Sequence, residues 1–325
     1  MHPFPVVPAR HLLLALAVVF IWGTNFAVIK IALADLPPLL FAALRYLLAA
    51  VPAIFFLRRP PVPWPNLIGY GLLIGVGQFG LLYMAMQGHI SPGLASLVIQ
   101  LQVFFTVGLS MLLTGERPRA FQYAATAVAA SGIVLIALRA DGHSATPAGL
   151  LMVTLAAISW SCGNMVSRAA FRHAGVNMLA YVAWSSLFAV APLALLSLGL
   201  EGLPRISQSL AGAHWSTWLA VAWQSFGNTL FGYGMWAWLL SRHPAASISP
   251  MALLVPVFGM GASALILGEP LPDWKLLAAA LVMAGLAINT LWPRLLHRMR
   301  TRAAARTPPR HCGQNRPPAL TNQAP

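Results

Sequence analysis

Arg45 is the residue whose position has the clearest chemical meaning, because it lies near the middle of the apolar run 36–57. A central arginine costs at least about 2.5–3.5 kcal/mol in a lipid bilayer, and no Asp or Glu lies well inside any apolar run to pair with it. Its planar fork of N–H donors suits a carboxylate. We predict that Arg45 is the counter-charge for an anionic or zwitterionic substrate. The alternatives are a guanidinium held by backbone carbonyls, or one that snorkels to the membrane surface.

A tryptophan and an asparagine recur together in two other apolar runs. Trp22 and Asn25 are three residues apart, and Trp160 and Asn164 are four residues apart, with Arg168 four residues further on. These spacings place each set on one face of a helix. We predict that the two faces line a cavity between two halves of the molecule. In the alternative, the asparagines hydrogen-bond between helices, worth about 0.6 kcal/mol on average, and the tryptophans only pack.

Further residues extend this predicted substrate-binding site. The additional amide and phenol groups expected to line the cavity are Gln78, Gln224, Asn228 and Tyr233. Two prolines, Pro250 and Pro256, stand inside a later apolar run. A proline within a membrane helix frees a backbone carbonyl and permits a bend. We therefore predict that these prolines belong to a gating helix.

The sequence lacks the motifs of several catalytic and cofactor sites. It has no GxxxxGK[ST] loop for ATP, no HExxH motif, no paired carboxylates and no Cys-His cluster. Cys162 falls inside an apolar run and Cys312 near the C-terminus, so neither a disulfide framework nor a zinc site is expected. We predict that the protein is not an enzyme and uses no cofactor and no metal. A simple Asp or Glu proton relay is not supported either, since no run buries a carboxylate.

The composition is that of a membrane protein. Of 325 residues, 58% are hydrophobic and 8% are charged, whereas a soluble domain has about 25% charged residues. Apolar runs of about 20 residues follow one another with short breaks, which indicates membrane helices, and the ten-residue alternating segments of a barrel are absent. The predicted span limits are 11–31, 36–57, 66–87, 92–113, 119–138, 147–170, 177–199, 215–240, 245–267 and 273–292. We thus expect an all-α membrane protein with ten transmembrane helices.

The second half of the chain repeats the first. Gly115-Glu116 follows one apolar run, Gly268-Glu269 follows another 153 residues later, and Gly132 matches Gly285 at the same separation. Five spans in each repeat is an odd number, so the two repeats must cross the membrane in opposite directions. Inverted repeats with a site between them are typical of secondary transporters that work by alternating access.

The repeats give three predicted segments. They are a first five-helix repeat, 1–140, a second, inverted five-helix repeat, 141–292, and a basic tail, 293–325. The tail is polar and rich in Arg and Pro, so we expect it to be disordered. The chain has a formal net charge of +14 at pH 7, and seven of its arginines lie in this tail. That clustering suggests attraction to anionic membrane lipid and does not indicate nucleic-acid binding.

The distribution of arginine predicts the orientation. Cytoplasmic segments of membrane proteins carry an excess of Lys and Arg. Arginines cluster at one set of chain ends and loops: Arg10, Arg58, Arg59, Arg117, Arg119, Arg168, Arg172, Arg242 and the tail. We predict a multi-pass membrane protein with both termini in the cytoplasm.

Four stretches carry a family resemblance. Residues 20–30 (Phe-Ile-Trp-Gly-Thr-Asn-Phe-Ala-Val-Ile-Lys), 93–98, 160–164 and 253–257, with the two Gly-Glu corners and the duplicated five-span unit, resemble the drug/metabolite transporter superfamily with two EamA-type domains. Within it, the chain looks like the bacterial exporters of O-acetylserine and cysteine. The resemblance covers nearly all of 10–292 and implies an inner-membrane exporter of cysteine-pathway metabolites, driven by the proton gradient.

The predicted function is therefore secondary export of small amino-acid metabolites. Arg45 would hold the substrate carboxylate, the amide side chains would hold the amine and side chain, and the aromatic residues would shape the pocket. One alternative is a broad-specificity exporter of drugs and metabolites that uses the aromatic lining. Another is a membrane scaffold or sensor that transports nothing. The sequence leaves the oligomeric state open, with a homodimer among the states it allows.

Overall fold

The structure is a computed structural model that describes residues 7–114, 119–139, 142, 144–170, 175–243 and 245–306. The described part is helical throughout, apart from turns, loops and one isolated bridge between Ile90 and Ala145. Helices satisfy all backbone polar groups within one segment, as lipid requires. The corner 115–118, which contains one of the two predicted Gly-Glu pairs, lies outside the described residues.

The first half of the chain forms five helical spans. Their elements are α1 (Ala9–Ala32), α2 (Pro38–Phe56), α3 (Trp64–Gly71) with the π-helical η1 (Leu72–Gly80) and α4 (Leu81–Gly88), α5 (Pro92–Val98) with the 3-10 turn η2 (Ile99–Leu101) and α6 (Gln102–Thr114), and α7 (Ala120–Leu138). Pro38 and Pro92 stand at the first positions of their helices, where a missing N–H costs nothing.

The second half follows the same order. Its elements are α8 (Pro147–Ala170), α9 (Met178–Leu200), the short connecting helix α10 (Leu203–Gly212), α11 (Trp215–Ala222) with the π-helical η3 (Trp223–Gly232) and α12 (Tyr233–Arg242), α13 (Ala245–Ile248) with the 3-10 segment η4 (Ser249–Leu254) and α14 (Val255–Leu267), and α15 (Asp273–Arg306). The third span of each half thus contains a π-helical segment, which is uncommon.

These helices confirm the predicted class. Within the described residues, nine helices are long and apolar enough to cross a membrane. The remaining predicted span, 215–240, is also helical through α11, η3 and α12, but it is interrupted by glycines and amide side chains. The protein is therefore an all-α membrane protein, and the ten predicted spans all correspond to helical segments.

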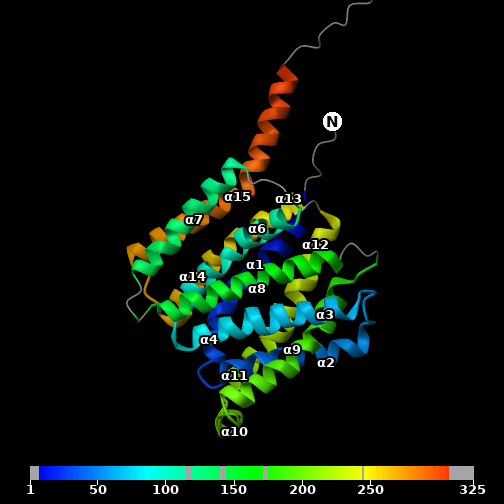
Figure 1. The fold of residues 1–325 in the computed structure, drawn as a ribbon, viewed down its shortest axis with the longest axis vertical. Coiled ribbons are helices and arrows are strands. Elements are labelled where there is room, and N and C mark those ends of the chain that lie inside the picture. Colours follow the sequence, from blue (N-terminus) through cyan, green and yellow to red (C-terminus); the bar gives the residue numbers. More distant parts are fainter. Residues whose placement is uncertain are drawn as a thin grey trace, which may run out of the picture.

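The C-terminal helix is longer than predicted. α15 continues to Arg306 and projects out of the bundle (Figure 1), so residues 293–306 of the predicted disordered tail are helical. Their polarity argued against a packed fold, but Leu, Arg and Ala are good helix formers and need no packing partner to extend an existing helix. Residues 307–325 lie outside the described part.

Contacts between the two halves come in exchanged pairs. α1 packs against α14, and the corresponding pair with the halves exchanged is α6 with α8. Likewise α1 packs against η3, and α8 packs against η1. Two further pairs, α2 with α9 and α7 with α15, join equivalent spans. A two-fold relation between the repeats produces this pattern, while the boundaries at 140 and 292 remain predictions.

The glycine shared by the two repeats shows the same relation at the level of atoms. A Cβ added to Gly132 would lie 2.8 Å from Val282 Cγ2 and 2.9 Å from the Ala278 carbonyl oxygen. A Cβ added to Gly285 would lie 2.6 Å from the carbonyl oxygen of Ala125, the residue equivalent to Ala278. The repeated glycine therefore allows α7 and α15 to pack closely.

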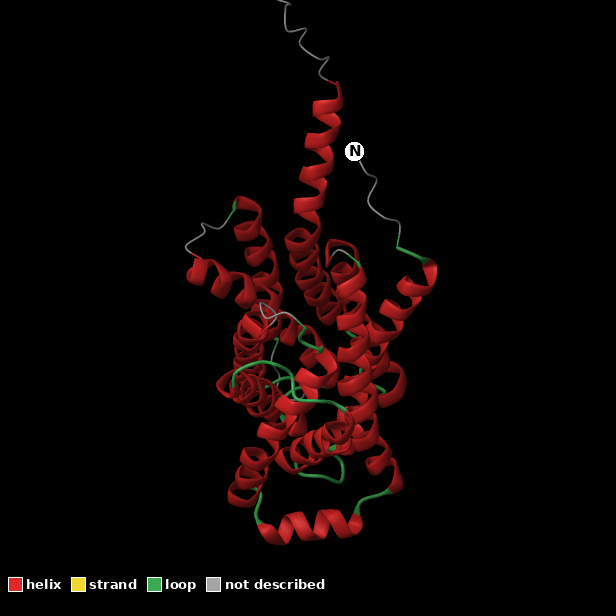
Figure 2. Ribbon diagram, turned by 90° about the vertical axis from the view of Figure 1, so that its right-hand side faces the viewer, coloured by secondary structure: helices red, strands yellow, loops and turns green. Residues whose placement is uncertain are grey.

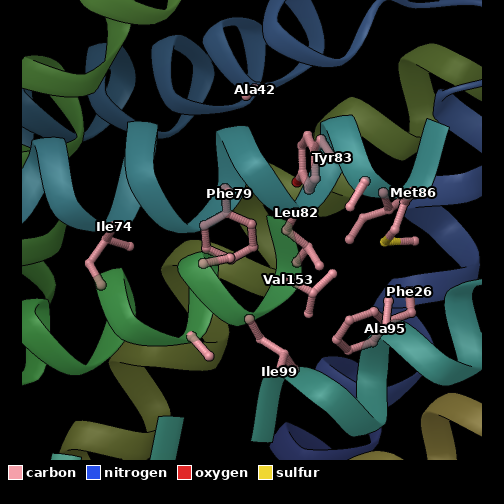
Figure 3. Packing of buried hydrophobic residues seen from close by; sticks show 14 of the residues in the cluster. Phe26, Ala42, Ile74, Phe79, Leu82, Tyr83, Met86, Ala95, Ile99 and Val153 are labelled. Atoms are coloured by element: carbon pink, nitrogen blue, oxygen red, sulfur yellow. The ribbon is translucent and has the colours of Figure 1, made fainter. Parts of the chain in front are cut away.

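The ends of the bundle differ. α10 lies across the end opposite to the N-terminus and to the projecting part of α15 (Figure 2). The core between the ends is centred on η1 and α4, whose side chains interlock with those of neighbouring spans (Figure 3). Labelled members of this cluster are Phe26, Ala42, Ile74, Phe79, Leu82, Tyr83, Met86, Ala95, Ile99 and Val153.

Candidate substrate-binding site

Arg45 of α2 is fully buried in the middle of the bundle. Its Nε and Nη2 donate to Thr229 Oγ1 at 3.1 and 3.0 Å, and its Nη1 donates to Tyr83 Oη at 2.8 Å. The guanidinium carbon lies 3.7 Å from the centre of the Phe79 ring, a stacking arrangement that favours a cation. The partners are hydroxyl groups, so Arg45 neither snorkels nor binds backbone carbonyls.

The positive charge of Arg45 has no acidic partner in the described part of the chain. The ion pairs found there are His214 with Asp35 and Lys275 with Glu269, and both involve loops at the ends of helices. A buried cation that meets only neutral hydroxyls is costly. Such a group is expected where an anion binds.

The hydroxyl partners of Arg45 belong to a buried network centred on Gln224. Tyr83 Oη donates to Gln224 Oε1 at 3.2 Å, and Thr229 Oγ1 donates to the Gln224 carbonyl oxygen at 2.7 Å. Gln224 Nε2 in turn donates to Asn25 Oδ1 at 2.5 Å, and Asn228 Nδ2 lies 3.4 Å from Gln224 Oε1. Three predicted residues, Asn25, Gln224 and Asn228, are thus brought together beside the arginine.

The π-helical segment η3 positions this network. It carries Gln224, Asn228 and Thr229 within one wide turn, so all three side chains reach the space beside α2 and α1. Thr229 Oγ1 donates to the carbonyl oxygen of Gln224, five residues before it. In an α-helix this carbonyl would accept from the backbone N–H of residue 228. π-Helical turns are found frequently at functional sites.

The aromatic residues predicted for this site lie at the edge of the network. Trp22 Nε1 donates to the Asn228 carbonyl oxygen at 3.4 Å. The Trp22 ring lies 5.4 Å from that of Tyr233 and 5.2 Å from that of Trp236. Gly232 leaves room for it, since a Cβ there would be 2.5 Å from Trp22 Nε1. The Trp22 ring therefore packs against neighbouring rings.

The second predicted pair lies in a separate cluster. Asn164 Nδ2 donates to Gln102 Oε1 at 3.1 Å and to Thr106 Oγ1 at 3.2 Å. Trp160 is half-buried and packs against the main core. These contacts join α8 to α6, and no hydrogen bond described here connects them to the Arg45 network. The structure therefore places Asn25 at the contact of α1 with η3 and Asn164 at the contact of α8 with α6, in two different junctions and not in one lining.

Gln78 and the two prolines occupy informative positions. Gln78 is 2% exposed, and its Oε1 has no hydrogen-bond partner in the described part of the chain. Pro250 and Pro256 stand in the first turns of η4 and α14. The span is thus broken into short segments, and each proline begins one segment instead of bending a continuous helix. The gating role of this span stays a prediction.

Comparison with known proteins identifies the family. The profile of the EamA-like transporter family matches the chain twice, over residues 9–138 and 147–291. This protein belongs to the EamA-like transporter family. The resemblance to EamA-type transporters inferred from the sequence motifs is confirmed, and the two matched ranges cover the two halves of the fold.

Several EamA-like relatives cover most of the chain. A probable amino-acid metabolite efflux pump of Salmonella typhimurium (strain LT2) is 44% identical over 278 residues, 85% of this chain and 93% of the relative. A protein of the same description from Escherichia coli (strain K12) is 41% identical over the same shares. One solved crystal structure, of a protein described in no further terms, covers 89% of this chain and 99% of its own at a TM-score of 0.61 and 24% identity, and so shares the fold.

Several residues of this EamA-like site were not predicted. Tyr83 and Thr229 hold the guanidinium, yet a hydroxyl within a membrane helix is too common to single out. Gln224 was predicted only as one lining amide, and it proves to be the centre of the network. A search for hydroxyls in the two spans with clustered glycines could have found Tyr83 and Thr229, because both of those spans pack against α2.

Proposed function

We propose that this protein is an inner-membrane secondary transporter that exports small amino-acid metabolites, of the cysteine and O-acetylserine type, by alternating access. The observation that carries the proposal is the fully buried Arg45, whose described partners are all uncharged. A substrate carboxylate would neutralise this charge through its fork of donors. The relatives named as amino-acid metabolite efflux pumps support the same substrate class.

The amine of such a substrate would be bound by oxygens without charge. Asn25 Oδ1 and Gln224 Oε1 already accept hydrogen bonds beside Arg45, and Gln78 Oε1 is a buried acceptor without a described partner. A site with one cation and several amide oxygens fits a zwitterion or a monoanion better than an organic cation. We also propose that both termini face the cytoplasm, in line with the arginine distribution.

Counterflow in proteoliposomes tests this function. Vesicles containing the purified full-length protein are loaded with unlabelled cysteine or O-acetylserine, and uptake of the labelled compound is followed. We expect uptake by the native protein and at least a tenfold loss for Arg45→Gln, because a charged hydrogen-bonded pair is worth about 1.5–3 kcal/mol. Arg45→Lys should retain part of the activity, since it keeps the charge but not the fork.

Arg168→Gln is the matched control, because Arg168 is an exposed arginine that donates to Ser110 at the end of α8. It should transport at the native rate. Equal rates for Arg45→Gln and native protein would refute the assignment of the carboxylate site. Uptake of lipophilic cations but no amino acid would favour the broad-specificity exporter, and the absence of any flux would favour the scaffold.

A further inference from the structure

A narrow cavity adjoins the Arg45 network. It lies between α2, the α3–η1 segment, α9 and the η3–α12 segment, and its walls include Tyr46, Tyr70, Ile74, Ser185, Thr229 and Tyr233. Thr229 is also the hydroxyl that accepts two hydrogen bonds from Arg45. The cavity measures about 10 Å³, close to the space that one water molecule requires. It thus adjoins the arginine site through Thr229.

Ser185 of α9 gives this cavity an unused polar group. Its side chain is 1% exposed, and its Oγ has no hydrogen-bond partner in the described part of the chain. The neighbouring Ser186, also in the cavity wall, donates to the Val182 carbonyl oxygen at 2.7 Å, the usual arrangement for a helical serine. A buried hydroxyl left unpaired destabilises the fold, so its presence beside a cavity points to a ligand group.

The rest of the wall is uncharged. The phenol rings of Tyr46, Tyr70 and Tyr233 and the side chains of Ile74 and Val182 form most of the surface. Tyr46 Oη has only a weak contact, 3.5 Å from the Ile74 carbonyl oxygen. Arg45 is the charged group beside the cavity, and a substrate carboxylate would already occupy that residue, so a second charged group would lose its hydration here without gaining a counter-ion. The cavity therefore suits a small neutral group that carries one hydrogen-bonding atom.

The walls come from both halves of the protein. α2 and η1 belong to the first half, and α9 and η3 belong to the second. Gly71 and Gly75 let these halves touch, because a Cβ at Gly71 would collide with the Ser185 carbonyl oxygen and one at Gly75 with Ala189 Cβ. Rocking of the halves in alternating access would change the width of this cavity directly.

We propose that this cavity is the side-chain subsite of the transport site, with Ser185 as its specificity-determining residue. The inference rests on the proposed function. With the substrate carboxylate on Arg45, the side chain enters between Tyr46 and Tyr233, and its hydroxyl, thiol or ester oxygen pairs with Ser185 Oγ. The subsite thereby selects amino-acid metabolites with a short, neutral, polar side chain and rejects acidic and basic ones.

Competition in the counterflow assay tests the subsite. Serine and 2-aminobutyrate have the same size and differ only in a hydroxyl and a methyl group. We expect the native protein to prefer serine and Ser185→Ala to lose about tenfold of this preference, since a site that pairs a hydroxyl discriminates strongly against the analogue without it. Ser263→Ala is the matched control and should leave the preference unchanged, because the Ser263 hydroxyl is also buried without a partner in the described part of the chain but lies on α14, outside the cavity wall.

A second variant gives a readout that needs no transport. In a background with Cys162→Ala and Cys312→Ala, Ser185→Cys provides a single thiol for a small methanethiosulfonate reagent. Serine should slow its labelling severalfold, and arginine should not. Equal labelling rates with and without serine, or an unchanged preference in Ser185→Ala, would overturn the subsite. If native protein carries neither amino acid, the proposed function fails and the subsite with it; if it carries both and the Ser185 variants behave as native, only the subsite fails.

Discussion

At the scale of single residues, the role of Arg45 in transport can be distinguished from its contribution to the stability of the fold. The guanidinium is stacked on Phe79 and bonded to two hydroxyls, but these do not replace a carboxylate. The hydroxyl groups of Tyr83 and Thr229 donate their own hydrogen bonds to Gln224, so both hydroxyls would stay hydrogen-bonded if Arg45 were replaced. We therefore expect that Arg45 serves substrate binding and contributes little to the free energy of unfolding.

Replacing Arg45 by Met should test this separation. The change removes an uncompensated buried charge and keeps similar volume, and such replacements are often neutral or stabilising. We expect an equal or higher Tm in detergent together with at least a tenfold loss of amino-acid counterflow. A large fall in Tm with transport intact would show that Arg45 is structural.

At the scale of elements, three acidic residues of the described part of the chain bind the ends of helices. Glu201 accepts from the backbone N–H groups of Leu39 and Leu40 at the start of α2, at 2.7 and 3.1 Å. Glu269 accepts from Gly93 N at 2.9 Å at the start of α5. Asp35 accepts from His214 N at 2.9 Å, just before α11. Each carboxylate meets a helix N-terminus from the other half, where a negative charge is stabilising.

The Glu269 corner contains the strongest of these contacts. Ser91 Oγ donates to Glu269 Oε1 at 2.5 Å and Lys275 Nζ at 3.1 Å. Lys275 is 1% exposed and the Glu269 side chain 7% exposed. Glu269 was predicted to lie at an inter-helix corner, and this pairing shows what it does there: it fastens span four to the corner between α14 and α15.

Breaking this pair should destabilise the protein more than removing it. Glu269→Gln leaves the buried Lys275 without a counter-ion, which costs about 3–5 kcal/mol and should lower Tm. The double variant Glu269→Gln, Lys275→Met should recover at least half of the loss. Thermal unfolding of the native protein, both single variants and the double variant closes the cycle. Additive losses would mean that the two residues do not interact.

At the scale of the whole molecule, the repeat determines which glycines are required. Gly132 and Gly285 both lie against the partner helix, whereas Gly108 and Gly261, a second pair at the same separation, have no atom within 4 Å of an added Cβ. The two pairs are equivalent in sequence and differ only in what surrounds them.

Alanine scanning of these four glycines is therefore an internally controlled test. Gly132→Ala and Gly285→Ala should each lower Tm, because the methyl group forces α7 and α15 apart. Gly108→Ala and Gly261→Ala should be neutral or stabilising by up to about 1 kcal/mol, as alanine favours a helix. Opposite behaviour of Gly132 and Gly285 would argue against a two-fold relation of the repeats.

Membrane orientation is a second property of the whole molecule. Arg58 lies in the loop after α2, and Ser207 lies on α10; both are exposed. In a cysteine-free background, Ser207→Cys should react with an impermeant thiol reagent on intact spheroplasts, and Arg58→Cys should react only after permeabilisation. The reverse pattern would place both termini outside.

The class of this protein and its candidate residues were predictable because they depend on local properties of the sequence. Apolar runs of membrane length need no partner to be recognised, and a cation inside one is costly wherever it packs. The repeat was visible because Gly132 and Gly285 occupy equivalent close contacts. The helical start of the tail was not predicted, since helix propensity there outweighed polar composition.

Only the tertiary structure decided which of these residues meet. Tyr83 and Thr229 reach Arg45, and Gln224 joins the two, because the spans that contain η1 and η3 both pack against α2, and this packing is not contained in the hydropathy of a segment. Packing likewise places Asn25 against η3 and Asn164 against α6, and it leaves Ser185 Oγ beside a cavity with no hydrogen-bond partner in the described part of the chain. A charged residue within an apolar segment can be recognised from the sequence of that segment alone, whereas a binding site depends on the faces that several segments present to one another.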